Sequence, residues 1–392
     1  MPAQYDVVVI GAGIHGAGVA QAAAAAGYSV LVLEQYDEIA KGSSSRSSKL
    51  IHGGLRYLES GEFHLVRECL RERAMLLRNA PHLVKLVPFY IPVYRNTRRR
   101  PWKIAFGLMV YSLFSRKRFH RIPRSDWNRL DGLRSDDLDA VFSYYDAQTD
   151  DARLTRSVLQ SARTLGADVI TGAELKQARL DSAEVKVSYQ KNGQSTTVAA
   201  RVLVNAAGSW VNHVLRRIRL PSGVAMEQYD MDLVQGTHIV VPGQISHPYY
   251  LEAPQDGRAV FVVPWKNNIM VGTTELSYHG DPADVRPTAA EIEYLLEIYN
   301  HHFKRDLTRG DMIDAFAGLR VLPAGGGNAS SKSRETHFHE NDPARPRVVS
   351  IYGGKLTSYR ATAEKLLRRI KTVLPETTPV ADTRSLEIPG ID

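Results

Sequence analysis

The chain opens with an apolar segment that runs into closely spaced glycines, and this feature restricts the fold more than any other. A small-residue helix pattern, a second apolar run and an acid follow. In order, these parts are residues 5–10, then Gly11, Gly13 and Gly16, then 17–26, 30–33 and Glu34. Together they predict one strand–helix–strand unit of a parallel sheet, with the G-x-G-x-x-G spacing of dinucleotide sites.

Each part of this pattern has a physical reason. Gly11 permits the tight turn, Gly13 lets the backbone approach a pyrophosphate, and Gly16 lets the helix pack close to the strand. The helix N-terminus offers N–H groups and a positive dipole end to phosphates. Glu34 stands about 20 residues on, where an acid accepts a hydrogen bond from a ribose hydroxyl. A glycine-rich turn without a ligand is the alternative; the complete unit favours the dinucleotide.

Length and cysteine content narrow the class of protein. The 392 residues exceed the usual size of one hydrophobic core, so two domains are expected. The single cysteine, Cys69, excludes an internal disulfide and a cysteine-rich metal site, and it favours a reducing compartment. No signal-peptide pattern is evident, so we expect a cytoplasmic location. No cluster of His, Asp or Cys has ligand spacing, so no metal is expected.

The positive charge is concentrated in one segment. Residues 95–124 contain ten Lys or Arg and no Asp or Glu, which is more than the whole net charge of +8. This distribution argues against a nucleic-acid-binding protein. Basic triplets at 98–100 and 116–118 flank an apolar, aromatic stretch too short to span a bilayer. Two interpretations are open: a buried helix with charged ends, or a helix that docks peripherally on the anionic inner face of the cytoplasmic membrane.

Two further regions, far apart in the sequence, suit a flat ring or a phosphate. Residues 42–49 are small and polar, and they lead directly into the apolar and glycine-containing stretch 50–57; a solvated linker is the alternative. Residues 348–360 run from a strand through two glycines into a helix, whose N-terminus is a second point that stabilises anions. Between these regions, 236–274 reads as short antiparallel strands that form a second layer over the cofactor.

These stretches together resemble the FAD-dependent, respiratory glycerol-3-phosphate dehydrogenases. The most specific likeness is Leu-Ile-His-Gly-Gly-Leu-Arg-Tyr at 50–57, whereas many flavoproteins share the nucleotide fingerprint. The likeness extends from residue 3 to residue 390. It rests on residues 10–16, 44–59, 150–154, 202–211, 236–241, 272–274, 318–320 and 353–360.

The resemblance implies an α/β fold: a Rossmann-like FAD domain of the glutathione-reductase and D-amino-acid-oxidase type, with an inserted α+β substrate domain that contains an antiparallel sheet. The expected FAD domain is discontinuous and comprises 1–88, 143–216 and 312–375; the substrate domain comprises 89–142 and 217–311, and 376–392 form a tail. The residues expected to bind FAD are Gly11, Gly13, Ile14, His15, Gly16, Glu34, Gln35, Ser44, Ser48, Lys49, Leu50, His52, Ala207, Gly208, Gly354, Lys355, Leu356 and Thr357. Lys355 and the nearby helix N-terminus are suited to the negative charge that reduced flavin gains near N1.

The resemblance also implies a phosphate clamp and a base. The expected substrate-binding residues are Arg56, Tyr57, Arg320, Arg334 and Lys355. The expected catalytic residues are His52, Arg320, Lys355 and His238. Guanidinium groups bind phosphate bidentately, and histidine is the natural base near neutral pH. His52 is the first candidate for the base and His238 the second.

The implied reaction is oxidation of sn-glycerol 3-phosphate to dihydroxyacetone phosphate by hydride transfer to FAD N5, with electrons passed to a quinone. An amine or 2-hydroxy acid oxidase on the same fold, and a non-catalytic flavin- or lipid-binding protein, are the alternatives. Ser209 and Val321 stand where the family commonly has proline. The chain stops about where the family's C-terminal helical domain would begin, so that domain is expected to be absent.

Overall fold

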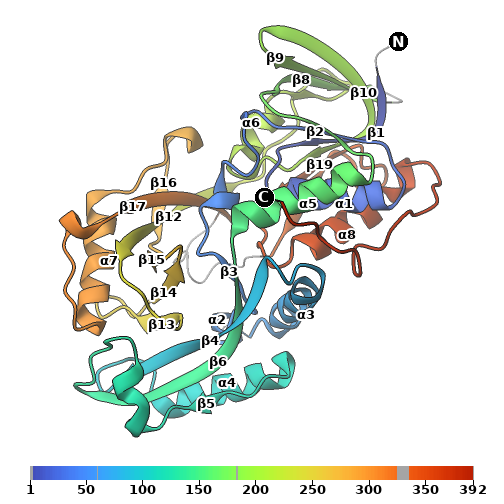
Figure 1. Ribbon diagram of the computed structural model, residues 1–392. Coiled ribbons are helices and arrows are strands. Elements are labelled where there is room, and N and C mark those ends of the chain that lie inside the picture. The colour runs from blue at the N-terminus through green and yellow to red at the C-terminus, as the bar shows by residue number, and fades with distance from the viewer. Residues whose placement is uncertain (1–2, 60, 182–183, 325–334, 392) are drawn as a thin grey trace.

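Two sheets with helices packed on them make up the molecule (Figure 1). The computed structural model describes residues 3–59, 61–181, 184–324 and 335–391. The first sheet, at the upper right of Figure 1, mixes parallel and antiparallel strands, and the second, at the left and below, is largely antiparallel. This arrangement confirms the predicted fold class, an α/β dinucleotide-binding fold with an added antiparallel sheet.

The first sheet is built around the predicted strand–helix–strand unit. Its strands in spatial order are β11 (Ile218–Arg219), β8 (Glu174–Leu180), β9 (Val185–Lys191), β10 (Gln194–Asn205), β1 (Gln4–Ile10), β2 (Val30–Leu33) and β7 (Asp168–Ile170), with β19 (Val348–Tyr352) beside β10 and β18 (His337–Glu340) beside β19. Helices α1 (Ile14–Ala25), α5 (Asp151–Thr164) and α8 (Tyr359–Ile370) cover one face (Figure 1). On the other face, side chains of the sheet's own β8, β9 and β10 form a second core cluster with α6 (Val211–Leu215).

Burial on both faces explains the sequence of this sheet. β1 pairs in parallel with β2 and with β10, and the four residues of β2 are all buried. A strand covered on two sides is apolar at every position rather than at alternate ones. Helix α1 consists mostly of alanine and glycine, so it can approach its neighbours closely. A Cβ added at Gly18 would lie 2.6 Å from the Tyr359 ring of α8.

The second sheet supplies the other wall of the site. Its strands in spatial order are β16 (Leu276–Tyr278), β12 (Met231–Pro242), β15 (Asn268–Gly272), β14 (Ala259–Trp265), β13 (Tyr249–Glu252), β4 (Val84–Tyr94), β6 (Leu138–Thr149) and β3 (Leu50–Ile51), with β17 (Asp314–Pro323) beside β12 and β5 (His120–Arg121) beside β6. Helix α7 (Ala289–His302) packs on one face, and α2 (Arg56–Glu59), α3 (Phe63–Asn79) and α4 (Pro101–Ser115) pack on the other.

The strands cross the boundaries expected from the sequence. The expected boundaries at 88 and 143 fall inside β4 and β6, which belong to the second sheet along their whole lengths. β17 also lies in this sheet, although 312–375 was assigned to the FAD domain. These three strands lie wholly in the second sheet, and the division into domains stays a prediction.

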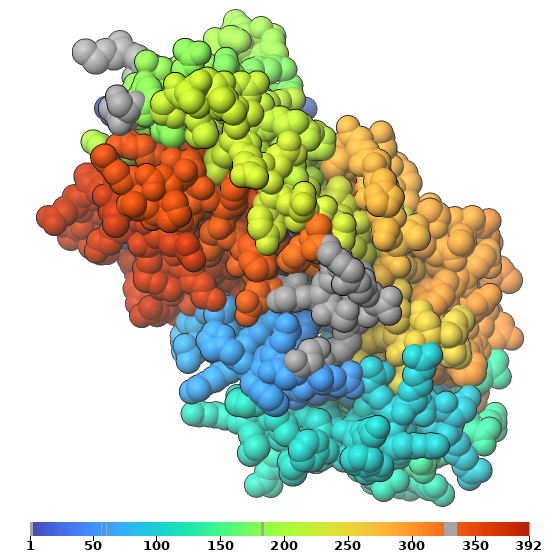
Figure 2. All heavy atoms as spheres, turned by 180° about the vertical axis from the view of Figure 1, so that it is seen from behind, coloured from blue at the N-terminus to red at the C-terminus, as the bar shows by residue number. Residues whose placement is uncertain are grey.

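Helix α4 exposes most of its apolar side chains. Only Leu108 and Tyr111 of this helix are buried. The exposed side chains are Phe63 of α3 and Trp102, Phe106, Met109, Leu113 and Phe114 of α4, a set that we name the α4 apolar face. The molecule's lower surface in Figure 2 includes this region. The interpretation of 95–124 as a buried helix is therefore wrong. Over the residues that the structure describes, no helix has the length and hydropathy to cross a membrane.

The buried His302 on α7 makes stability depend on pH. Burial lowers its pKa from 6.5 to about 4. Between these values the unfolded chain binds a proton that the folded chain does not, so stability falls as the pH falls below 6.5. We expect His302 to remove about 2 kcal/mol of unfolding free energy between pH 7.5 and pH 5. Urea unfolding of His302→Phe should show a pH dependence that is smaller by this amount, whereas His301→Phe, exposed on the same helix, should match the wild type.

Candidate active site

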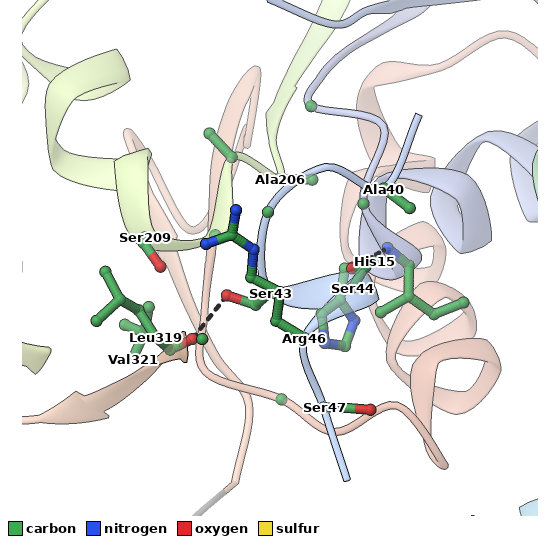
Figure 3. Close-up of a pocket in the computed structure, with 18 of the residues that line it drawn as sticks. His15, Ala40, Ser43, Ser44, Arg46, Ser47, Ala206, Ser209, Leu319 and Val321 are labelled. Carbon is green, nitrogen blue, oxygen red and sulfur yellow. Dashed lines mark hydrogen bonds between the residues drawn. The ribbon is translucent and has the colours of Figure 1, made fainter. Parts of the chain in front are cut away.

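One large cavity lies where the two sheets meet (Figure 3). It has a volume of about 350 Å³. The lining residues come mainly from 10–15, 33–36, 40–52, 206–210, 318–322 and 353–357. Figure 3 shows Ser43, Ser44 and Arg46 between the start of α1 and the strand that carries Leu319 and Val321. The cavity thus brings together the N-terminal, central and C-terminal parts of the chain that were singled out in the sequence.

The glycine loop forms one end of this cavity. Gly11 has φ +100°, and a Cβ there would lie 2.8 Å from the carbonyl oxygen of Ala206. A Cβ at Gly16 would lie only 1.8 Å from the carbonyl oxygen of Gly11, so any side chain would separate α1 from β1. Gly16 therefore has the packing role expected of the third glycine, and it is not among the lining residues.

Polar groups around the start of α1 are arranged for a nucleotide. The buried Glu34 carboxylate accepts from the backbone N–H of Ala12 at 2.7 Å and of Tyr36 at 3.0 Å. Burial raises the pKa of Glu34, and these two N–H groups act in the opposite direction. Ser44 Oγ accepts from the N–H of Ile14 at 2.9 Å, which fixes the 42–48 loop against the helix N-terminus (Figure 3).

Two segments about 300 residues apart meet at the other end of the cavity. A Cβ at Gly354 would lie 2.2 Å from His15 Nε2, so the C-terminal turn packs directly on the start of α1. The backbone N–H of His52 donates to Thr357 Oγ1 at 3.2 Å, and this hydroxyl donates back to the carbonyl oxygen of His52 at 3.3 Å. The turn at 353–357 and the turn at 52–54 are therefore held against each other.

Lys355 places a buried positive charge in this wall. Its Nζ atom is buried without a hydrogen-bond partner among the described residues. It lies 3.6 Å from the ring centroid of Tyr57, a cation–π contact that stabilises the ammonium only in part. A buried ammonium without hydrogen bonds is costly, so an acceptor from a ligand is expected at this point.

Arg320 reaches the cavity from β17. Its Nη1 atom pairs with Glu275 at 2.9 Å, and its Nη2 atom donates to the carbonyl oxygen of Thr274 at 2.7 Å. Glu275 also lies 3.4 Å from Arg258, so two guanidinium groups share one carboxylate. These contacts hold the guanidinium of Arg320 in a fixed orientation at the cavity wall.

The two candidate bases have different surroundings. His238 on β12 is 2% exposed, is stacked on Phe316, and has Nε2 at 2.9 Å from Ser48 Oγ. Burial lowers its pKa to about 3, with smaller contributions from Lys49 and Arg320. A neutral imidazole of this kind can orient a hydroxyl group but is a weak proton acceptor. His52 also lines the cavity and is only partly buried, which favours it as the base.

Three expected site residues cannot be placed in the cavity: Lys49 lies elsewhere, and Arg334 and the side chain of Arg56 fall outside the described part. Lys49 does not line the cavity: its buried Nζ pairs with Asp151 at 2.6 Å and donates to the carbonyl oxygen of Ser45 at 2.5 Å. Lys49 therefore holds the 45–49 loop against the start of α5. Arg334 lies outside the described residues, and Arg56 is described only as the first residue of α2.

The remaining expected residues all line the cavity. They are Gly11, Gly13, Ile14, His15, Glu34, Gln35, Ser44, Ser48, Leu50, His52, Tyr57, Ala207, Gly208, His238, Arg320, Gly354, Lys355, Leu356 and Thr357. Sequence reasoning missed Arg46, Asp151 and Trp210 as lining residues. Each stands next to a predicted strand or loop. The sequence does not show in which direction a single charged or aromatic side chain beside a turn points.

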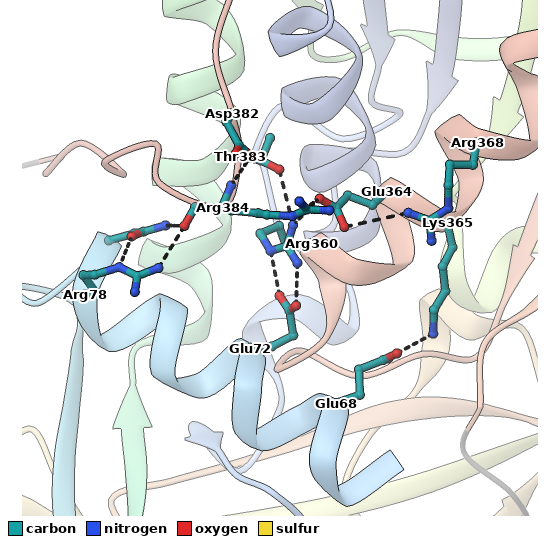
Figure 4. Close-up of polar contacts among 11 residues, drawn as sticks. Glu68, Glu72, Arg78, Arg360, Glu364, Lys365, Arg368, Asp382, Thr383 and Arg384 are labelled. Carbon is teal, nitrogen blue, oxygen red and sulfur yellow. Dashed lines mark hydrogen bonds and ion pairs between the residues drawn. The ribbon is translucent and has the colours of Figure 1, made fainter. Parts of the chain in front are cut away.

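A buried ion-pair network fixes helix α8, which follows the 353–357 turn (Figure 4). Arg360 donates to both oxygens of Glu72 on α3, at 2.8 and 2.5 Å. It also pairs with Glu364 at 2.8 Å. Lys365 pairs with Glu68 one turn away at 2.5 Å. Because α3 follows the 52–57 stretch closely, this network holds the two turns of the cavity in register.

Comparison with known proteins agrees with this geometry. The family model described as FAD dependent oxidoreductase matches residues 6–376. The chain is 39% identical to the glycerol-3-phosphate dehydrogenase of Pseudomonas aeruginosa, over 98% of this chain and 75% of that protein. It is 37% identical to the D-erythritol 1-phosphate dehydrogenase of Brucella abortus, over 96% and 75%. The structure of the Bacillus halodurans glycerol-3-phosphate dehydrogenase complexed with FAD matches with a TM-score of 0.76 and 27% identity, over 98% of this chain and 68% of that one.

The residues present fit FAD. The backbone at Gly11 and Gly13 leaves room for a diphosphate beside the N-terminus of α1, and Glu34 has oxygen lone pairs free for a ribose hydroxyl. At the far end, the unpartnered ammonium of Lys355 is suited to a group that gains negative charge on reduction. No group of three or more metal-ligating side chains occurs within the described ranges. The chain therefore uses FAD and belongs to the FAD-dependent oxidoreductase family, among the FAD-dependent glycerol-3-phosphate dehydrogenases and their relatives.

Proposed function

We propose that this flavoenzyme oxidises sn-glycerol 3-phosphate to dihydroxyacetone phosphate and passes the electrons to a quinone. The observation that carries the substrate is the pair of cations at the His52 end of the cavity. Lys355 has no hydrogen-bond partner among the described residues, and Arg320 lines the same cavity with its guanidinium oriented by Glu275 and Thr274. A phosphate ester supplies an acceptor for the Lys355 ammonium and an anion that a guanidinium binds bidentately.

The residues around the turns have distinct tasks in this reaction. FAD, when bound, supplies the hydride acceptor at its N5 atom. Arg320 and Lys355 hold the phosphate, so that the secondary alcohol of the substrate lies near His52. His52 takes the hydroxyl proton as the C–H bond breaks. His238 stays neutral near pH 7 because its pKa is lowered to about 3, and it orients the alcohol by a hydrogen bond.

Anaerobic addition of glycerol 3-phosphate to the purified yellow protein tests this proposal. We expect rapid loss of the flavin absorption near about 450 nm. Glycerol should leave the absorption unchanged, because it lacks the phosphate. Bleaching by amino acids or 2-hydroxy acids, but not by the phosphate ester, would instead support the amine or hydroxy acid oxidase. A protein that stays oxidised with every substrate would support a non-catalytic role.

D-Erythritol 1-phosphate is a second candidate substrate. The relative from Brucella abortus that is named for it is nearly as similar as the glycerol-3-phosphate dehydrogenases. Both substrates are phosphorylated polyols, so the same cations suit both. The two are separated by their kcat/KM values for flavin reduction, measured side by side.

Quinone as the acceptor is supported by the α4 apolar face. This face is flanked by basic residues, including Arg98, Arg100, Arg116, Lys117 and Arg118. Exposed aromatic and aliphatic side chains bordered by positive charge suit the headgroup layer of an anionic membrane, where a lipid-soluble acceptor is found. Reoxidation of the reduced enzyme by a soluble quinone analogue should be much faster than reoxidation by oxygen.

Peripheral binding to the membrane is expected to depend on the α4 apolar face. The intact protein should float with anionic vesicles and not with neutral ones. Replacing two strongly exposed apolar side chains of this face, as in the double variant F106E/L113E, should abolish flotation, because two negative charges would enter the headgroup boundary. Val224→Glu, which places the same charge at a 63% exposed apolar residue elsewhere, is the matched control. Flotation of the double variant at the wild-type level would remove the proposal.

A further inference from the structure

Arg46 is a cavity residue whose positive charge is not paired with a carboxylate in the part of the chain that the structure describes. It follows the short helix η1 (Ser43–Ser45), and its side chain extends into the cavity (Figure 3). Its one hydrogen bond among the described residues runs from Nη1 to the carbonyl oxygen of Ala317, at 3.1 Å. A guanidinium group has five N–H donors, so four of them find no partner in the described part of the chain.

Among the described residues, the other two arginines that line the cavity each pair with a carboxylate. Arg217 pairs with Glu174 at 2.8 Å, and Arg320 pairs with Glu275 at 2.9 Å. Lys355 lies over the Tyr57 ring. Burial lowers the pKa of Arg46, and the like charge of the neighbouring Arg286 lowers it further. Within the described ranges no carboxylate lies within ion-pair distance of it, so its guanidinium is open to an anion from outside the chain.

The position of Arg46 identifies this anion. Ser44, two residues before it, is hydrogen-bonded to the N-terminus of α1, where the backbone is open to a diphosphate. The diphosphate is the only anionic part of oxidised FAD, and guanidinium groups bind such oxygens with paired hydrogen bonds. We propose that Arg46 binds the diphosphate of FAD from the side opposite the glycine loop and thereby sets the affinity for the cofactor. This role concerns cofactor binding alone and does not depend on the substrate.

Release of FAD from the purified holoprotein tests the assignment. FAD that leaves the protein becomes fluorescent, so dilution series give the dissociation constant without any turnover. We expect Arg46→Gln to raise the dissociation constant about 10- to 100-fold at low salt, the range for losing hydrogen bonds to a charged group. Arg46→Lys keeps the positive charge but loses the paired N–H donors of the guanidinium, so its dissociation constant should lie between those of the wild type and Arg46→Gln. The effect of Arg46→Gln should shrink between about 50 mM and about 500 mM salt, because screening weakens the lost charge interaction.

Arg286→Gln is the matched control. It removes the same charge from a neighbouring exposed residue that does not line the cavity, and it should change the dissociation constant by less than about threefold. The assignment is overturned if Arg46→Gln binds FAD as the wild type does. It is equally overturned if Arg286→Gln loses as much affinity, or if the loss in Arg46→Gln is the same at both salt concentrations. Failure of the substrate proposal would leave all of these results unchanged.

Discussion

Replacing His52 with alanine should slow the reduction of bound flavin by glycerol 3-phosphate at least about 100-fold, which is the cost of losing a general base. His52 lines the cavity at the turn that Thr357 holds, and it shares this end with Lys355. The substrate hydroxyl must lose its proton as the hydride leaves, and alanine offers no acceptor. Stopped-flow measurement of flavin bleaching at saturating substrate isolates this step from binding and from reoxidation.

The variant His238→Gln is the control for His52→Ala, because comparing their flavin-reduction rates shows which histidine is the base. Because the pKa of His238 is lowered to about 3, it already acts as a neutral hydrogen-bonding group, and glutamine keeps that capacity. We expect the rate of flavin reduction in His238→Gln to fall about tenfold or less, because only the orientation of the substrate hydroxyl is disturbed. If His238→Gln is the slower of the two variants, the roles of the two histidines are reversed. If both variants reduce flavin at wild-type rates, the proton leaves by another route.

Local rules in the sequence predicted most of the fold. The G-x-G-x-x-G unit became β1, α1 and β2, with the acid at the strand end. Asn192 and Gly193 are typical turn residues; both have positive φ and join the antiparallel strands β9 and β10. Thr288 caps α7 with Glu291 in a capping box. In each case the signal is carried by residues that are neighbours in the chain, so no knowledge of distant contacts is required.

Features that depend on distant contacts were predicted less well. Lys49 stands in the middle of a cofactor-like stretch, yet Asp151, 102 residues away, turns it into a structural ion pair. Residues 101–115 are apolar on every side, and composition cannot tell a buried helix from one whose apolar face meets another surface. Arg46 was not predicted, since only the fold shows that its side chain lines the cavity and donates to a backbone carbonyl rather than to a carboxylate.

Asp146 is a buried charge behind the turn at 52–54, and we expect its replacement to lower the stability of the protein strongly. It is 1% exposed, and it accepts from Arg73, from the Tyr111 hydroxyl at 2.8 Å and from the Gly53 N–H at 3.3 Å. The Tyr111 hydroxyl also accepts from Gly53 N–H at 3.0 Å, so α4 is tied to the turn that carries His52. Asp146→Ala should lower the unfolding free energy by about 3–5 kcal/mol, because it leaves the buried guanidinium of Arg73 unpaired. Urea unfolding at neutral pH measures this change.

Two further variants separate the charge from the hydrogen bonds of this cluster. Tyr111→Phe keeps the ion pair and removes one hydroxyl, so it should cost only about 1–2 kcal/mol. Asp136→Ala, at an exposed position that precedes β6, should stay within about 0.5 kcal/mol of the wild type. Since Gly53 adjoins His52, Tyr111→Phe should also slow flavin reduction while FAD remains bound. If Asp146→Ala is no less stable than Asp136→Ala, the buried pair does not hold the turn, and the order of the site must come from the contacts between Thr357 and His52 alone.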